Sequence, residues 1–142
     1  MDITIHPRTL RGSINIIPSK SQAHRLLICA AFADRPTELL CPETNQDIES
    51  TASCLNALGA SIRRTDTGYC IIPCNTPNQK AVLNCHERGS TLRFLLPVAS
   101  ALGVETTLKM EGRLPQRPLS PLWEEMQRMG CSLKWIAPDE LL

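Results

Sequence analysis

The sequence lacks several features that would assign a function at once. Its 142 residues carry a net charge of only +1, a field too weak to predict nucleic acid or a membrane as a partner. No apolar run approaches the ~18 residues that cross a bilayer. Met1-Asp2-Ile3 begins the chain without the basic and apolar regions of a signal peptide, which predicts a cytoplasmic location.

Signatures of metal binding and hydrolysis are also missing. The seven cysteines form no Cys-x-x-Cys pair, and Cys70-x-x-x-Cys74 has no second pair of ligands nearby. Scattered thiols of this kind fit a reducing compartment. None of the three histidines has an acid and a nucleophile at triad spacing, so packing or surface positions are expected for them. The sequence therefore predicts neither a metal site nor hydrolase chemistry.

Strand-like and helix-like apolar patterns follow one another in a repeated order. The expected elements are strands at 2–6 and 13–17, a helix at 22–32, a strand at 37–41, a helix at 45–58, strands at 61–64, 69–72 and 81–83, a helix at 89–102, a strand at 106–110, a helix at 118–129 and a strand at 132–135. The order strand-helix-strand-helix-strand occurs twice, and only the first copy has a further closing strand. This asymmetry predicts an α/β chain that ends inside its second repeat. The alternative is a domain whose two repeats simply differ.

The first segment suited to anion binding is Lys20-Ser21-Gln22-Ala23-His24-Arg25, after the expected helix cap Ser19. A helix N-terminus offers unpaired N–H groups and partial positive charge, which favour phosphate or carboxylate. Lys20 adds a mobile charge, and Arg25 lies one turn beyond Ser21 on the same face. The alternative is an ordinary helix cap with solvated basic side chains.

Two further segments also enter helices. In Glu87–Arg93, Gly89 allows close approach of the backbone to a ligand. In Gly112–Pro118, Pro118 restricts Arg117 to an extended conformation and so limits where its guanidinium points. The alternatives are a capped turn and a basic surface loop. Because α/β folds place ligands at loops of this kind, the three segments together predict a multiply anionic small ligand.

These segments resemble motifs of a known family. Residues 20–25 resemble a Lys-Ser-x-x-x-Arg motif, 45–48 an acidic turn, 89–94 a Gly-Thr/Ser-x-x-Arg motif and 112–119 an Arg-x-x-x-Arg-Pro motif. Taken in this order, the four are similar to the EPSP synthase (3-phosphoshikimate 1-carboxyvinyltransferase) family of enolpyruvyl transferases. The resemblance covers nearly the whole chain but only the N-terminal part of the family's much longer sequence.

The resemblance implies two lobes of repeated β-α-β-α-β-β units, of which this chain holds one full unit and most of a second. Residues 1–17 would belong to the other lobe, and residues 18–142 would form an incomplete N-terminal lobe. The family transfers the enolpyruvyl group of phosphoenolpyruvate to shikimate 3-phosphate, a step toward chorismate and the aromatic amino acids. It requires no metal and no organic cofactor.

The matched positions imply roles for individual residues. Lys20, Ser21 and Arg25 would bind shikimate 3-phosphate. Lys20, Gly89 and Arg117 would bind phosphoenolpyruvate. The residues that move protons during catalysis would lie outside this chain, so it is expected to be inactive alone. Its incomplete lobe would expose apolar faces, through which the chain could self-associate.

Local departures and alternatives accompany this resemblance. Arg88 stands where the family usually has a small residue, and His86 stands where glycine is common. Glu87 could pair with Arg88 and so reduce the effect of that cation on the ligand. The alternatives are a non-catalytic anion-binding module and an enolpyruvyl transferase acting on UDP-N-acetylglucosamine. Ser21 argues against the second, because that enzyme carries asparagine after its lysine.

Overall fold

The computed structural model describes residues 3–4, 6–9, 11–14 and 16–142. Its elements are α1 (Lys20–Ala31), β1 (Thr37–Leu40), α2 (Gln46–Leu58), β2 (Ser61–Arg64), β3 (Gly68–Ile72), β4 (Lys80–His86), α3 (Gly89–Ala101), β5 (Glu105–Met110), the short 3₁₀ helix η1 (Leu114–Gln116), α4 (Leu122–Arg128), β6 (Trp135–Ala137) and β7 (Glu140–Leu141). In the described part of the chain, no helix is long and apolar enough to cross a membrane.

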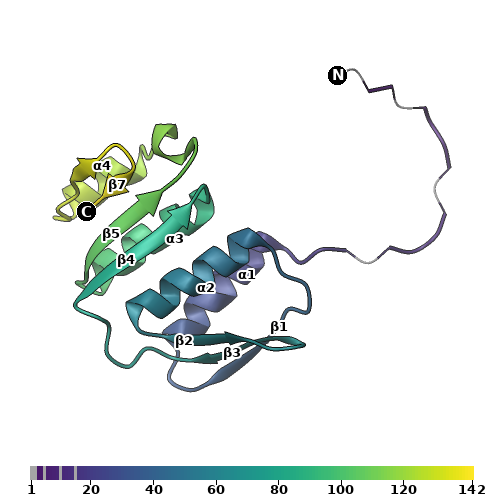
Figure 1. Cartoon of the computed structure of the whole chain (residues 1–142), viewed down its shortest axis with the longest axis horizontal. Helices are drawn as coiled ribbons and strands as arrows, with labels where there is room; N and C mark the ends of the chain where they lie inside the picture. The colour runs from purple at the N-terminus through teal and green to yellow at the C-terminus, as the bar shows by residue number, and fades with distance from the viewer. Residues whose placement is uncertain (1–2, 5, 10, 15) are drawn as a thin grey trace.

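The strands form two separate sheets, with α1 and α2 lying between them (Figure 1). The first sheet has the order β1-β3-β2 and is antiparallel throughout. The second has the order β4-β5-β7-β6, with β4 and β5 parallel and the other pairs antiparallel. Along the chain, β4, α3, β5, α4, β6 and β7 give the order β-α-β-α-β-β. The elements from α1 to β3 follow the same order from its first helix onward. The predicted α/β fold with repeated units is thus confirmed.

The ends of the two units differ from the prediction. The second unit has the closing strand that the sequence was expected to lack, because β7 pairs with both β5 and β6. A strand of two residues is too short to show alternation in a sequence. The first unit has no opening strand among the described residues. Of the two strands expected there, residues 3–4, 6, 13–14 and 16–17 have no strand structure, and Asp2, Ile5 and Asn15 lie outside the described residues.

The last helix also begins later than expected. Pro118 does not open it; α4 starts at Leu122, with Pro121 at the position before the helix. A residue that precedes proline is disfavoured in the α region. Arg117 and Ser120 each precede a proline, so the helix cannot form until both prolines have been passed. Instead, Leu114–Gln116 form the 3₁₀ turn, and Arg117 is extended as predicted.

Local signals account for where the two central helices begin and end. The Ser19 hydroxyl accepts a hydrogen bond from the amide of Gln22 and caps α1 as expected. Asn45 caps α2 by accepting from the amides of Asp47 and Ile48. Gly59 ends α2 in a left-handed conformation with a φ of 117°. Apolar side chains of both helices enter one core with side chains of both sheets.

A buried chain of polar side chains joins the three long helices. His24 of α1 lies 2.7 Å from the hydroxyl of Thr51 in α2, and that hydroxyl lies 2.9 Å from the hydroxyl of Thr91 in α3. All three side chains are buried. His24 is thus a packing histidine, as the sequence predicted. Because each member is hydrogen-bonded, the chain fixes how the N-terminal halves of the helices sit together.

Stability should fall as the pH drops below about 6.5, the ordinary pKa of histidine. Burial lowers the pKa of His24, with Asp47 opposing that shift and Lys20 and Arg25 reinforcing it. The folded state therefore binds this proton less readily than the unfolded state. The contribution of His24 to stability is present above pH 6.5 and is lost below it. The urea midpoint should fall more between pH 7.5 and pH 5.0 for the wild type than for His24→Gln. An equal loss of stability in His24→Gln would contradict this prediction. His6→Gln is the control, because His6 is exposed.

Candidate functional site

The N-terminal ends of α1, α2 and α3 meet beside the loop before α4 and enclose a hollow of about 450 Å³. Its lining comes from four separate parts of the chain: Lys20, Asp47, Glu87, Arg88, Gly89, Ser90, Arg93, Phe94 and Arg117. Four of these side chains are basic and two are acidic. The hollow is therefore positively charged, although the chain as a whole is almost neutral. A small ligand with several negative charges fits this balance.

Lys20 is the first residue of α1 and points across to the first turn of α2. Its ammonium lies 2.5 Å from the carboxylate of Asp47, and about half of the lysine side chain is exposed. Asp47 also lies at a helix N-terminus, where a carboxylate is favoured by the partial positive charge of the helix. Lys20 is therefore held by an internal anion.

Ser21 and Arg25 lie at the edge of the hollow and do not line it. Both residues are exposed, and the guanidinium of Arg25 donates to the backbone carbonyl of Ser21 at 2.8 Å. The same guanidinium lies 4.9 Å from the centre of the Phe94 ring, which does line the hollow. This stacking holds the cation beside the opening. The structure thus brings the three predicted residues of α1 to one side of the site.

Gly89 and Arg117 lie together although 28 positions separate them in the sequence. A Cβ atom on Gly89 would lie 3.5 Å from one terminal nitrogen of Arg117 and 2.7 Å from one of Arg93. Arg93 donates to the carbonyl of Gly89 at 3.3 Å and to that of Pro118 at 2.8 Å. Arg93 therefore fastens the start of α3 to the loop that carries Arg117.

Glu87 and Arg88 have different partners in the structure. The Glu87 carboxylate accepts a hydrogen bond from the backbone amide of Arg113 at 3.2 Å. A Cβ atom on Gly112, which has a φ of 57°, would lie only 2.7 Å from the carboxyl carbon of Glu87. Glu87 is thus committed to the loop after β5, and Arg88 turns the other way, toward α2. Its Nε lies 3.0 Å from Asp47, and its terminal nitrogen donates to Gln46.

Sequence reasoning did not assign Asp47, Arg93 or Phe94 to the site. Arg93 and Phe94 belong to a motif that was recognised, but nothing local shows which way their side chains point. Asp47 was expected only as a first-turn acid of its helix. Its contact with Lys20 joins positions 27 residues apart, which no local spacing predicts.

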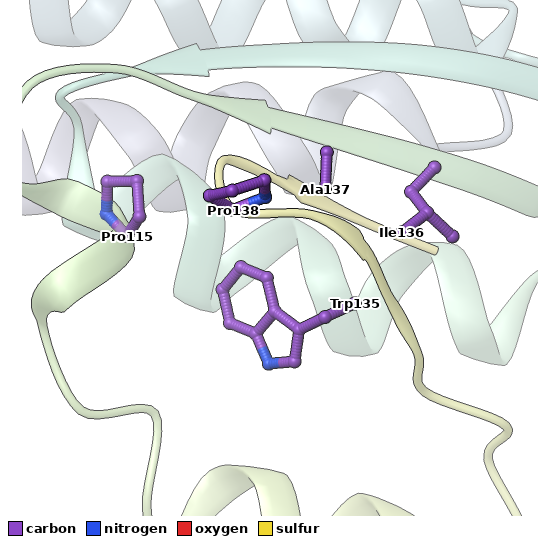
Figure 2. A pocket seen from close by; sticks show the side chains of 5 residues that line it. All are labelled: Pro115, Trp135, Ile136, Ala137 and Pro138. Carbon is purple, nitrogen blue, oxygen red and sulfur yellow. The ribbon is translucent and has the colours of Figure 1, made fainter.

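A second hollow of about 330 Å³ has a different character. It is lined by Pro115 and by the hairpin residues Trp135, Ile136, Ala137 and Pro138 (Figure 2). No charged side chain lines it, and the indole of Trp135 stacks on that of Trp123 with ring centres 6.2 Å apart. An anion would find no partner there. The hollow at the helix N-termini is the candidate functional site.

Comparison with known proteins gives a consistent result. The chain matches the family model for EPSP synthase (3-phosphoshikimate 1-carboxyvinyltransferase) over residues 5–138. A 3-phosphoshikimate 1-carboxyvinyltransferase of Clostridium kluyveri is 37% identical over 123 residues, which are 86% of this chain and 29% of that protein. One of Clostridium beijerinckii is 31% identical over 149 aligned positions, covering 99% of this chain and 34% of that protein.

A solved structure agrees at the level of the fold. An EPSP synthase of Acinetobacter baumannii superimposes with a TM-score of 0.77 at 19% identity, covering 92% of this chain and 31% of that one. The chain therefore spans about a third of the length of the proteins it matches.

Proposed function

The chain belongs to the EPSP synthase family, and we propose that it supplies one substrate-binding half of a 3-phosphoshikimate 1-carboxyvinyltransferase. The complete enzyme would transfer the enolpyruvyl group of phosphoenolpyruvate to the 5-hydroxyl of shikimate 3-phosphate and release phosphate. Both substrates carry a phosphate and a carboxylate, so a site for them needs several fixed cations. The reaction would also develop charge that such cations stabilise.

A single observation carries this proposal. Lys20, Gly89 and Arg117 come from three distant segments and line one positively charged hollow. The resemblance assigns these same residues to phosphoenolpyruvate. Gly89 opens the thirteen-residue helix α3, so its amide can face an anion and no side chain blocks the approach. Arg117 adds a guanidinium that can bind a phosphate or carboxylate through two hydrogen bonds.

Shikimate 3-phosphate would bind on the α1 side of the same hollow. Ser21 and Arg25 are both exposed there, beside Lys20 at the helix N-terminus. The Arg25 guanidinium would have to exchange its bond to the Ser21 carbonyl for one to the ligand phosphate. Lys20 would then lie between the two substrates and contact both.

The chain alone is proposed to bind without turning over, since the residues that move protons are expected outside it. Residues 1–17 are proposed to belong to the other lobe, and 18–142 to an incomplete N-terminal lobe. In support, the described residues of the first segment run away from the body of the molecule, and Ile14, Ile16 and Ile17 are 79–86% exposed (Figure 1). Exposed apolar residues of the body, such as Leu40 and Met129, support self-association as a further proposal.

Of the alternatives, a sugar-nucleotide substrate gains no support from the family model or from the relatives described above. The other candidate is a non-catalytic module that binds an anion through the same hollow. The sequence that follows Leu142 in the gene would distinguish the two, since further repeat units would favour the enzyme. A cytoplasmic location is proposed on the basis of the seven thiols, all of which are free.

The proposal is tested by titrating shikimate 3-phosphate into the ¹⁵N-labelled chain and following its amide NMR signals. Residues 20–25 and 88–93 should shift, and Arg25→Ala should weaken binding by ~10- to 100-fold, the effect of one hydrogen bond to a charged group. Arg63→Ala, on an exposed arginine of β2, should bind like the wild type. Repeating the titration at two chain concentrations separates ligand shifts from self-association. No shift in the wild type, or equal binding by Arg25→Ala, would overturn the proposal.

A further inference from the structure

Three charged side chains form a cluster at the entrance to the hollow, which we call the Asp47 cluster. Asp47 lies at its centre, with Lys20 at 2.5 Å from one carboxylate oxygen and Arg88 at 3.0 Å from the other. The cluster joins the first turns of α1 and α2 to the residue just before α3. It therefore links all three elements that would hold the ligand.

The two cations of the cluster are held in different ways. The side chains of Arg88 and Asp47 are only 28% and 22% exposed, whereas that of Lys20 is 54% exposed. Arg88 is also fixed by its hydrogen bond to Gln46 in the same helical turn as Asp47. Lys20 has no second fixed partner among the hydrogen bonds of the described residues. An approaching anion can therefore draw Lys20 away more easily than Arg88.

Lys20 cannot serve a ligand fully while it remains paired with Asp47. Removing it from that pair would leave a largely buried carboxylate without a counter-ion, which is costly. Arg88 prevents this, because its positive charge stays beside the other carboxylate oxygen, at 3.0 Å and without a hydrogen bond from Nε. The net charge of the cluster is then one positive charge, carried by the residue that can move.

We propose that Arg88 is a positioning residue, which holds Asp47 so that Lys20 is released to the bound anion. The inference rests on the proposed function, since it concerns the same ligand. Arg88 itself points to α2 and is not a ligand in this arrangement. The proposal also accounts for a bulky cation next to Gly89, because its side chain is held by Asp47 and Gln46 of α2.

Three variants separate this role from a direct one, with shikimate 3-phosphate as the probe. Arg88→Ala should weaken binding about fivefold, the scale of one partly exposed ion pair, because Asp47 then holds Lys20 alone. The double variant Arg88→Ala/Asp47→Asn should bind within about twofold of the wild type, since nothing holds Lys20 back. Arg88→Ala/Glu87→Gln restores the same net charge without freeing Lys20, so it should remain weak.

Each other result overturns the proposal. Weak binding by both double variants would indicate that Arg88 is a direct ligand of the anion. Equal rescue by Glu87→Gln and Asp47→Asn would reduce its role to net charge. Wild-type affinity in Arg88→Ala would remove the role altogether.

A measurement without ligand separates this inference from the proposed function. The ¹⁵N signal of the Lys20 ammonium should move between the wild type and Arg88→Ala, and should move the opposite way when Asp47→Asn is added. If shikimate 3-phosphate binds no form of the chain, the proposed function fails while this test still applies. An ammonium signal that is unchanged in Arg88→Ala would then overturn the positioning role.

Discussion

Lys20→Met should reduce the affinity of the chain for shikimate 3-phosphate by ~100-fold, because it removes a charged hydrogen bond and a full charge from a partly enclosed site. Methionine keeps a long, flexible stem, so the packing of α1 should change little. The loss should exceed that of Arg88→Ala, since Lys20 is proposed to touch the ligand itself. Isothermal titration calorimetry or the NMR titration measures the effect.

Lys80→Met is the matched control for this variant. Lys80 also pairs with a carboxylate, that of Glu105 at 2.8 Å, but it lies at the start of β4, away from the hollow. Its loss should leave ligand affinity unchanged and cost little stability, because exposed ion pairs contribute less than about 1 kcal/mol. If Lys20→Met binds as tightly as Lys80→Met, Lys20 is not a ligand and the proposed site is wrong.

Gly68→Ala should destabilise the chain by about 4 kcal/mol or more, a large share of what holds a domain of this size together. Gly68 opens β3, the central strand of the first sheet, with a φ of 158°. A Cβ atom there would lie 1.8 Å from the carbonyl oxygen of Leu39 and 2.6 Å from the amide nitrogen of Cys41. Both are backbone atoms, so relief requires β1 to separate from β3.

Gly103→Ala tests whether space or conformation causes this loss. Gly103 has a φ of 66°, and a Cβ there would meet nothing within 4 Å. Its substitution should cost only the ~1–2 kcal/mol of a left-handed non-glycine residue. Urea unfolding followed by circular dichroism gives both values. Equal losses in the two variants would show that contact with β1 is not what makes Gly68 necessary.

The boundaries of α1 and α2 were predictable because their signals are local. Ser19, Asn45 and Gly59 stand at the ends of α1 and α2, and each acts through hydrogen bonds or backbone angles within one turn. The hairpin of β2 and β3 was equally clear, since the turn residues Asp66-Thr67-Gly68 lie between two short strand-like segments. The β6–β7 hairpin was not, because its strands are too short to show alternation and depend on β5 for their place.

The sequence by itself determined the family, the order of the units and the motifs that carry the anion-binding residues. Each of these depends on residues close together in the chain. Only the tertiary structure decided that Lys20 and Arg88 share Asp47, that Arg93 ties Gly89 to the loop of Arg117, and that Glu87 turns to Arg113. These contacts join residues 25 or more positions apart. A charged side chain can reach several partners, and the packing of the three helices selects which of them it meets.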